Sequence, residues 1–214
     1  MTTSACSCRC AAVAASIAAL VITAPEVVRA RFRGQSTRVM LATAARLRPT
    51  AASGDIEIIT ALTVLRHLAR RVRFLAAEAV EHETAIRTIV RSWRPDLLEL
   101  TGVGPIVAAT VLTAWSHPGR CRDDAAFAML AGAAPIPASS GKTVRYRLNR
   151  SGDRQLNRAL HTVTLSRLQH DERTRAYADR RRTQGKTDRE IKRCLKRYIA
   201  RELYRRLETP LATA

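Results

Sequence analysis

The feature that most constrains the fold is an apolar repeat between residues 55 and 93. Apolar side chains recur there at alternating spacings of three and four residues, and His82 is the one polar member. The repeat positions are Ile58, Ala61, Leu65, Leu68, Val72, Leu75, Ala79, His82, Ile86, Ile89 and Trp93. Such a repeat keeps one stripe on the same side of a helix, so the sequence predicts one long helix that ends before Pro95. The stripe has two interpretations: a coiled-coil seam against a partner helix, or an amphipathic face packed on its own domain.

Breaks on either side of this helix predict three parts. The proline- and glycine-containing stretch 49–54 separates a residual N-terminal helical segment, residues 1–54, from the long helix, residues 55–94. Residues 95–214 form the predicted C-terminal domain. Aromatic residues make up only 4% of the chain, and alanine and leucine, which dominate its apolar residues, favour helices. We therefore expect a mainly α protein: a long coiled-coil-type helix, then a helical domain with one small β element.

The charge of the chain predicts a polyanionic partner. Lys and Arg number 37 against 18 Asp and Glu, a net charge of +19. Between Lys142 and Arg206 there are 21 basic and 7 acidic residues. Arginine dominates, and its planar fork suits phosphate oxygens. The basic region lacks the Trp/Phe-rich face of a membrane-binding helix, so we expect nucleic acid and no membrane as partner.

A glycine hairpin follows Pro95. The segment Leu97–Glu99 is predicted to be helical, Gly102-Val103-Gly104 forms the hairpin, and Pro105 begins a second helix. This pattern resembles a helix-hairpin-helix, in which exposed N–H groups bind phosphate without reading sequence. The alternative is a plain turn between two helices.

A serine-containing loop and an arginine-rich strand come next. Two prolines stiffen residues 131–142, which present Ser139 and Ser140 beside Gly141. A short strand is predicted over 144–148 and a helix from Gly152 to about His170. Such a loop is usually a turn, but the neighbouring cations could stabilise the charge of a phosphorus centre under attack by serine. The predicted phosphate ligands of this region are Lys142, Arg145, Arg147, Arg150 and Arg154.

The last predicted helix begins at a capping box, Thr187 to Glu190. Its apolar stripe consists of Ile191, Leu195, Ile199 and Leu203. The opposite side carries predicted phosphate contacts at Lys192, Arg193, Lys196 and Arg197; the alternative is a solvated face. Asp123-Asp124 is interpreted as an N-cap with a first-turn charge, since adjacent residues do not face one another on a helix.

The cysteines and the first residues predict a cytoplasmic protein. Cys6, Cys8 and Cys10 could hold a soft metal, but no second Cys/His pair lies nearby, so we interpret them as reduced thiols. The apolar run 11–24 imitates a signal peptide but is too short to span a bilayer. We expect localisation in the bacterial cytoplasm, associated with the nucleoid.

Several motifs resemble the carboxy-terminal domain of insertion-sequence transposase family one hundred and ten. They are L-x-L-T-G-V-G-P at 98–105, A-G-A-A-P-I-P-A-S-S-G-K at 131–142, R-x-R-L-N-R-S-G-D-R-Q-L-N-R-A-L at 145–160, H-D-x-R-T-R-A-Y at 170–177, G-K-T-x-R-E-I-x-R-C-L-K-R-Y at 185–198 and A-R-E at 200–202. A weaker likeness reaches back to Thr23.

The resemblance implies a mobile-element transposase whose carboxy-terminal domain supplies a serine nucleophile. The motif serine falls on Ser140, with Ser139 as the neighbouring fallback. Members of the family also have an amino-terminal RuvC-like domain with a DEDD site for Mg²⁺, and they recombine DNA under a structured guide RNA as oligomers. The residues before Thr23 are too few for such a domain, so we expect an N-terminally truncated chain without a cofactor of its own and without autonomous activity.

The sequence therefore predicts the C-terminal part of a transposase, which binds DNA and guide RNA and forms a homo-oligomer through the long helix. Two alternatives stay open. One is a non-catalytic nucleic-acid-binding fragment or inhibitor of intact transposase. The other is a helix-hairpin-helix DNA-repair accessory.

Overall fold

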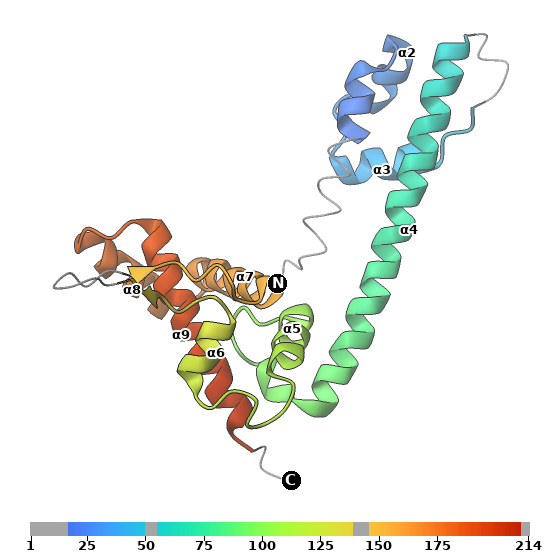
Figure 1. Ribbon diagram of the computed structural model, residues 1–214. Helices are drawn as coiled ribbons and strands as arrows, with labels where there is room; N and C mark the ends of the chain where they lie inside the picture. Colours follow the sequence, from blue (N-terminus) through green and yellow to red (C-terminus); the bar gives the residue numbers. More distant parts are fainter. Residues whose placement is uncertain (1–16, 50–54, 139–145, 211–214) are drawn as a thin grey trace. The chain divides into compact units, whose positions relative to one another are not determined.

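The computed structural model describes residues 17–49, 55–138 and 146–210, and it is mainly α-helical with one small two-stranded sheet (Figure 1). The predicted fold class is therefore confirmed. The chain divides into two compact units, one reaching Thr84 and the other beginning at Ala85. No helix in the described ranges is long and apolar enough to cross a membrane.

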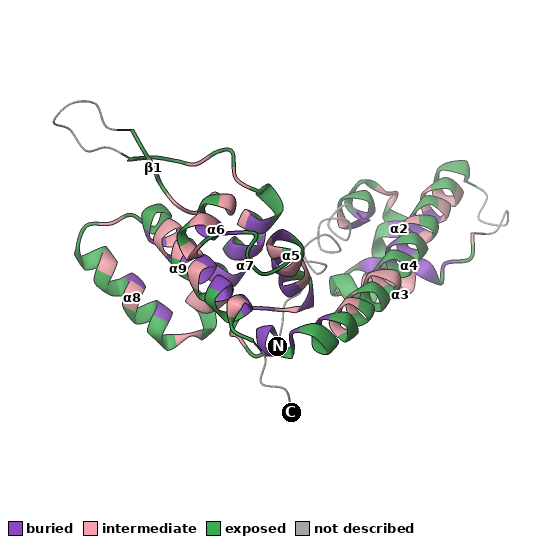
Figure 2. Ribbon diagram, turned by 60° about the horizontal axis from the view of Figure 1, so that its bottom comes forward, coloured by how far each residue is buried: buried purple, intermediate pink, exposed green. Residues whose placement is uncertain are grey.

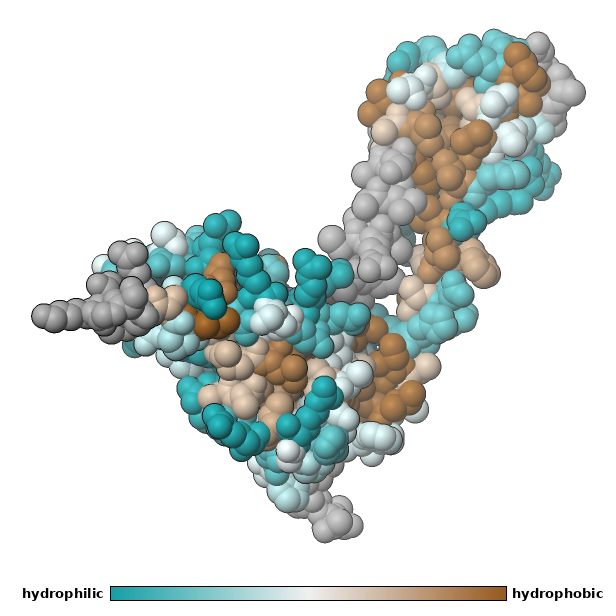
Figure 3. Space-filling view, viewed as in Figure 1, coloured by the Kyte–Doolittle hydropathy of each residue, from teal (hydrophilic) through white to brown (hydrophobic). Residues whose placement is uncertain are grey.

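The N-terminal unit packs short helical segments against the first part of the long helix. A helical segment at 17–23 is followed by α2 (Glu26–Arg29), the 3-10 turn η1 (Ala30–Phe32) and α3 (Thr37–Ala45). Hydrophobic side chains gather over these helices in Figure 3. The buried core residues of the unit are Ile17, Val21, Val28, Phe32, Ala44, Ala45, Leu47, Leu62, Leu65, Ala69 and Val72.

Helix α4 (Ile56–Trp93) confirms the predicted long helix. The positions of its apolar seam differ in burial. Leu65 and Val72 are buried in the core of the N-terminal unit, and Leu68 packs against that core. Further along, Leu75 is 46% exposed and Trp93 is 70% exposed. The first half of the seam thus serves its own unit, as the amphipathic interpretation expects, whereas these later positions present apolar surface.

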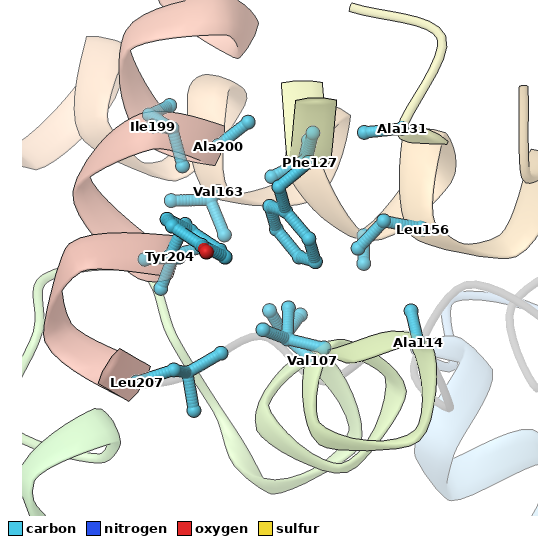
Figure 4. Packing of buried hydrophobic residues seen from close by; sticks show 14 of the residues in the cluster. Val107, Ala114, Phe127, Ala131, Leu156, Val163, Ile199, Ala200, Tyr204 and Leu207 are labelled. Atoms are coloured by element: carbon cyan, nitrogen blue, oxygen red, sulfur yellow. The ribbon is translucent and has the colours of Figure 1, made fainter. Parts of the chain in front are cut away.

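Within the described residues, the larger core of the C-terminal unit surrounds Phe127, and a smaller core consists of Ala178, Ile191 and Leu195. The helices of this unit are α5 (Pro105–Trp115), α6 (Asp124–Leu130), α7 (Arg154–His170), α8 (Glu172–Thr183) and α9 (Asp188–Glu208). Phe127 from α6 lies among side chains from α5, α7 and α9 (Figure 4). Its ring centroid is 5.6 Å from that of Tyr204, whose hydroxyl donates to the Cys121 carbonyl over 2.6 Å. The predicted stripe of the last helix, Ile191 to Leu203, is buried throughout. By contrast, α8 is mostly exposed (Figure 2).

Local capping sets the helix starts. Asp123 accepts a hydrogen bond from the Ala126 N–H, and Thr187 and Glu190 form a capping box, as predicted. Helix α7 begins at Arg154, two residues later than expected. The reason is that Asp153 is its N-cap, and Gly152 is held in close contact with Gly132: a Cβ on Gly152 would lie 2.4 Å from the Gly132 Cα.

The small sheet pairs β1 (Ile136–Pro137) with β2 (Tyr146–Arg147) in antiparallel register, Ile136 opposite Arg147. The Asn149 amide donates to the Met129 carbonyl over 2.8 Å, which ties the segment after β2 to the end of α6. The sheet and this tie position the strand pair beside the first turns of α7.

Candidate nucleic-acid interface

A groove of about 1280 Å³ crosses the C-terminal unit. Its lining comes from residues 132–135, residues 146–154, α7 and the first half of α9. The basic side chains that line it are Arg147, Arg150, Arg154, Arg158, Lys186, Arg189, Lys192, Arg193, Lys196 and Arg197. Glu190 is the one acidic residue of the described lining, so the groove is a site of concentrated positive charge.

The cations of the groove form no ion pairs within the described ranges, where other arginines pair with Asp or Glu. The pKa of Glu190 is nevertheless lowered, first by hydrogen bonds from Thr187 and then in part by the charges of Lys186 and Arg193. Lys196 instead donates from Nζ to Asn157 Oδ1 over 2.9 Å, and Asn157 donates from Nδ2 to the Ala131 carbonyl over 2.7 Å. This chain of hydrogen bonds joins α9, α7 and the end of α6 at the floor of the groove.

Burial and neighbouring positive charges lower the pKa values of two side chains that line the groove. Burial, and then the charge of Arg193, lower the pKa of Lys196. Partial desolvation, followed by the charges of Lys196 and Lys192, lowers the pKa of His161. An anion in the groove would favour the protonated form of both side chains.

Comparison with known proteins assigns this unit to a family. Residues 95–179 match the model of the IS116/IS110/IS902 transposase family. The chain is 34% identical over 135 residues to the insertion element IS900 uncharacterized 42 kDa protein of Mycobacterium paratuberculosis, which covers 59% of this chain and 33% of that protein. It is 35% identical over 94 residues to the insertion element IS110 uncharacterized 43.6 kDa protein of Streptomyces coelicolor, covering 44% of this chain and 23% of the relative. The chain contains an IS110-family transposase region. It thus spans about a third or less of the length of these relatives.

This assignment decides between two of the sequence-based interpretations. A transposase region replaces the hypothesis of a repair accessory unrelated to transposition. The matched residues include α5, α6, the small sheet and α7, and therefore one wall of the groove. The other wall, from α9, lies beyond the matched range.

The groove brings seven predicted phosphate ligands together. Arg147, Arg150 and Arg154 come from β2 and the start of α7, and Lys192, Arg193, Lys196 and Arg197 come from α9. Sequence reasoning missed Arg158, Lys186 and Arg189 in the same lining. The signal for Arg158 was present, because it follows Arg154 by four residues and so lies on the same face of α7.

The glycine hairpin lies outside the lining of the groove. Gly102 has φ +83°, and a Cβ there would lie 3.2 Å from the Val163 carbonyl, so the turn fits closely against α7. Val103 is buried in the core, and its N–H donates to the Leu100 carbonyl. Gly104 is the N-cap of α5, with Pro105 in the first turn. Ahead of the hairpin there is a 3-10 turn, η3 (Pro95–Leu97), and not an α-helix, because Arg94 and Asp96 pair there and Arg94 donates to the Leu207 carbonyl at the end of α9.

Four predicted site residues, Ser139, Ser140, Lys142 and Arg145, lie outside the described residues. On either side of them, the groove is bordered by Pro135, which precedes β1, and by Tyr146 and Arg147 of β2. In the described part of the chain, no three His, Cys, Asp or Glu side chains gather into a group that could hold a metal ion. The cysteine run at 6–10 also falls outside that part.

Proposed function

We propose that the C-terminal unit binds the phosphate backbone of nucleic acid in the basic groove, with DNA as one partner and a structured guide RNA as the other. The observation that carries this is the set of ten basic side chains without an ion-pair partner in the described chain. Concentrating such cations in one groove costs folding free energy through self-repulsion, which a polyanion relieves. A DNA partner means that the protein works at the bacterial nucleoid.

The salt dependence of binding tests this proposal. If six or more phosphates are contacted, affinity for duplex DNA or RNA should fall by about 10³-fold or more between ~50 and ~200 mM salt, because bound counterions are released on association. Fluorescence anisotropy with labelled oligonucleotides measures it. A flat salt dependence would contradict an electrostatic groove.

We also propose that Ser140 attacks a phosphodiester of the bound DNA. A bond forms between Ser140 Oγ and phosphorus, the bond from phosphorus to the departing sugar oxygen breaks, and that oxygen takes up the hydroxyl proton. Arg147 and Arg150, which border the groove, are suited to stabilising the added charge on the phosphoryl oxygens. The family resemblance implies Mg²⁺ held by a DEDD set of carboxylates. The described residues contain no group that could form this set, and the proposed step does not involve the ion.

A covalent adduct tests the chemistry. Incubation with the metal-binding domain of an intact relative, guide RNA and DNA should give a protein–DNA adduct that survives denaturation. The adduct should be absent from Ser140→Ala and present in Ser139→Ala. An adduct that persists in Ser140→Ala would show that another residue is the nucleophile.

Self-association through α4 is a further part of the proposal. The exposed seam positions Leu75, Ile89 and Trp93 offer apolar surface to a second copy, whereas Leu68 packs in its own unit. Replacing Leu75 and Trp93 with lysine should therefore give folded monomers in sedimentation, without the loss of fold expected from a lysine at Leu68. A parent protein that is already monomeric at micromolar concentration would exclude the coiled-coil interpretation.

A further inference from the structure

Two tyrosines and three arginines form an aromatic–arginine cluster on α8 and α9. The rings of Tyr177 and Tyr198 meet edge to face, with centroids 5.9 Å apart and planes at 84°. The guanidinium carbons of Arg180 and Arg181 lie 5.7 and 5.8 Å from the Tyr177 centroid, and that of Arg197 lies 6.0 Å from the Tyr198 centroid. These are distances at which a cation is attracted to the face of a ring.

The two rings differ in burial. Tyr177 packs on the small core of Ala178, Ile191 and Leu195, and burial, followed by interactions with Cys194, raises the pKa of its hydroxyl. Tyr198 is 51% exposed and belongs to none of the core clusters in the described ranges. Its ring therefore lies outside those cores and contacts the ring of Tyr177.

The cluster is continuous with the basic groove. Arg197 lines the groove and also lies over Tyr198, and Cys194, another lining residue, interacts with Tyr177. Arg180 and Arg197 form no ion pair within residues 17–49, 55–138 and 146–210. The buried Nε atoms of Arg181 and Arg197 also have no hydrogen-bond acceptor in that part of the chain. These guanidinium groups thus lie against the tyrosine rings, and that of Arg181 also donates to Gln184 Oε1 over 2.7 Å.

We propose that Tyr198 is a stacking platform for an unpaired base of a single-stranded nucleic acid whose phosphates lie in the groove. The inference rests on the proposed binding function of that groove. An aromatic ring can stack on a base only where the face of the base is free, which a continuous duplex does not offer. Arg197 connects the two contacts, since it is near both the phosphate path and the ring. The occupant is a run of unpaired nucleotides, either the loop of a structured RNA or an opened DNA strand.

The matched variants Tyr198→Leu and Tyr198→Phe test the platform. Leucine keeps apolar bulk and helix propensity but removes the π face, whereas phenylalanine keeps the face and removes the hydroxyl. Tyr198→Leu should weaken binding of a short single-stranded oligonucleotide about tenfold at fixed salt. Tyr198→Phe should bind like the parent, and neither variant should change the affinity for a duplex of the same sequence. Parallel RNA and DNA oligonucleotides identify the source, since the arm with the larger loss is the natural occupant.

Several outcomes would overturn the inference. One such outcome is that Tyr198→Leu binds single strands like the parent, while alanine at Lys192, Arg193 and Arg197 weakens this binding. The stacking proposal would then be wrong, and the proposal of phosphate binding in the groove would be supported. If neither change weakens binding, the groove proposal fails as well. An equal loss of affinity for duplex and single strand would make Tyr198 a general contact and not a stacking site.

Crosslinking gives a measurement that is independent of variant folding. An iodo-substituted pyrimidine in the oligonucleotide should crosslink to Tyr198 in the parent protein. Crosslinking only to other residues would contradict the stacking proposal.

Discussion

The two halves of helix α9 carry the same kind of residue in opposite circumstances. In the first half, Lys192, Arg193 and Arg197 line the groove and form no ion pair within the described ranges. In the second half, Arg201 and Arg205 both donate to Asp124 at the start of α6, over 3.0 and 2.8 Å. The first half has charge available to a ligand, whereas the second half uses its charge to hold two helices together.

The environment of Asp124 shows what the second half gains. The Asp124 side chain is only 15% exposed. Burial raises its pKa, but hydrogen bonds from Arg201 and Arg205 outweigh burial and leave the pKa below the ordinary value. The buried Arg94–Asp96 pair at the end of α9 has the same character, with the Arg94 hydrogen bond as the main cause of a lowered Asp96 pKa. Net charge therefore overstates the cations that can bind nucleic acid.

The test with the largest expected effect compares alanine variants in the two halves of α9. Alanine at Lys192, Arg193 and Arg197 should lower affinity for nucleic acid about 10- to 100-fold and reduce the salt slope by roughly three, because three phosphate contacts are lost. The matched control has alanine at Arg201 and Arg205 and should keep the parent's affinity within about threefold. Anisotropy titrations over a range of salt give both values. Losses in proportion to the number of charges removed, three and two, would mean that only total charge matters.

A second test concerns stability. Asp124→Ala should lower the free energy of unfolding by about 1–2 kcal/mol at neutral pH, since a largely buried carboxylate that joins α6 to α9 is removed. A carboxyl whose pKa is lowered in the folded state stabilises above its unfolded pKa, and that stability is lost as pH falls through the folded pKa. The difference between parent and variant in urea unfolding should therefore shrink below about pH 4. A difference that stays constant down to pH 2 would contradict the ion-pair explanation.

The smallest expected effect is a pH dependence of binding. The pKa of His161 is lowered in the free groove, first by desolvation and then by Lys196 and Lys192. Nearby phosphates favour the imidazolium, so the complex takes up a proton and affinity should rise as pH falls from about 7.5 to 6, by roughly two- to fivefold. His161→Gln should remove that rise and leave the affinity at higher pH nearly unchanged. The same rise in His161→Gln would assign it to another group.

Local sequence patterns predicted α4, the starts of α6 and α9, and the resemblance to the transposase family. The apolar repeat defined α4 to within one residue, and Asp123 and Thr187 marked the starts of α6 and α9, because periodicity and capping depend on neighbours only a few residues away. The motifs over 98–202 indicated the transposase family, and the family match at 95–179 agrees. Seven of the predicted phosphate ligands line one groove, but they come from β2, the segment after it, α7 and α9, and the packing of these elements brings them together.

Packing between distant segments determines which of these residues are available to a ligand. Asp124 neutralises arginines 77 and 81 residues further along the chain, a pairing that no local pattern encodes. Leu68 and Leu75 occupy equivalent positions of one seam, yet Leu68 packs in a core and Leu75 is exposed, because the short helices of the N-terminal unit cover only the first half of α4. Tyr198 became a candidate only when α8 brought Tyr177 and its arginines beside it. Packing between distant segments sets burial and ion pairing, and these determine whether a charged or aromatic side chain is left for a ligand.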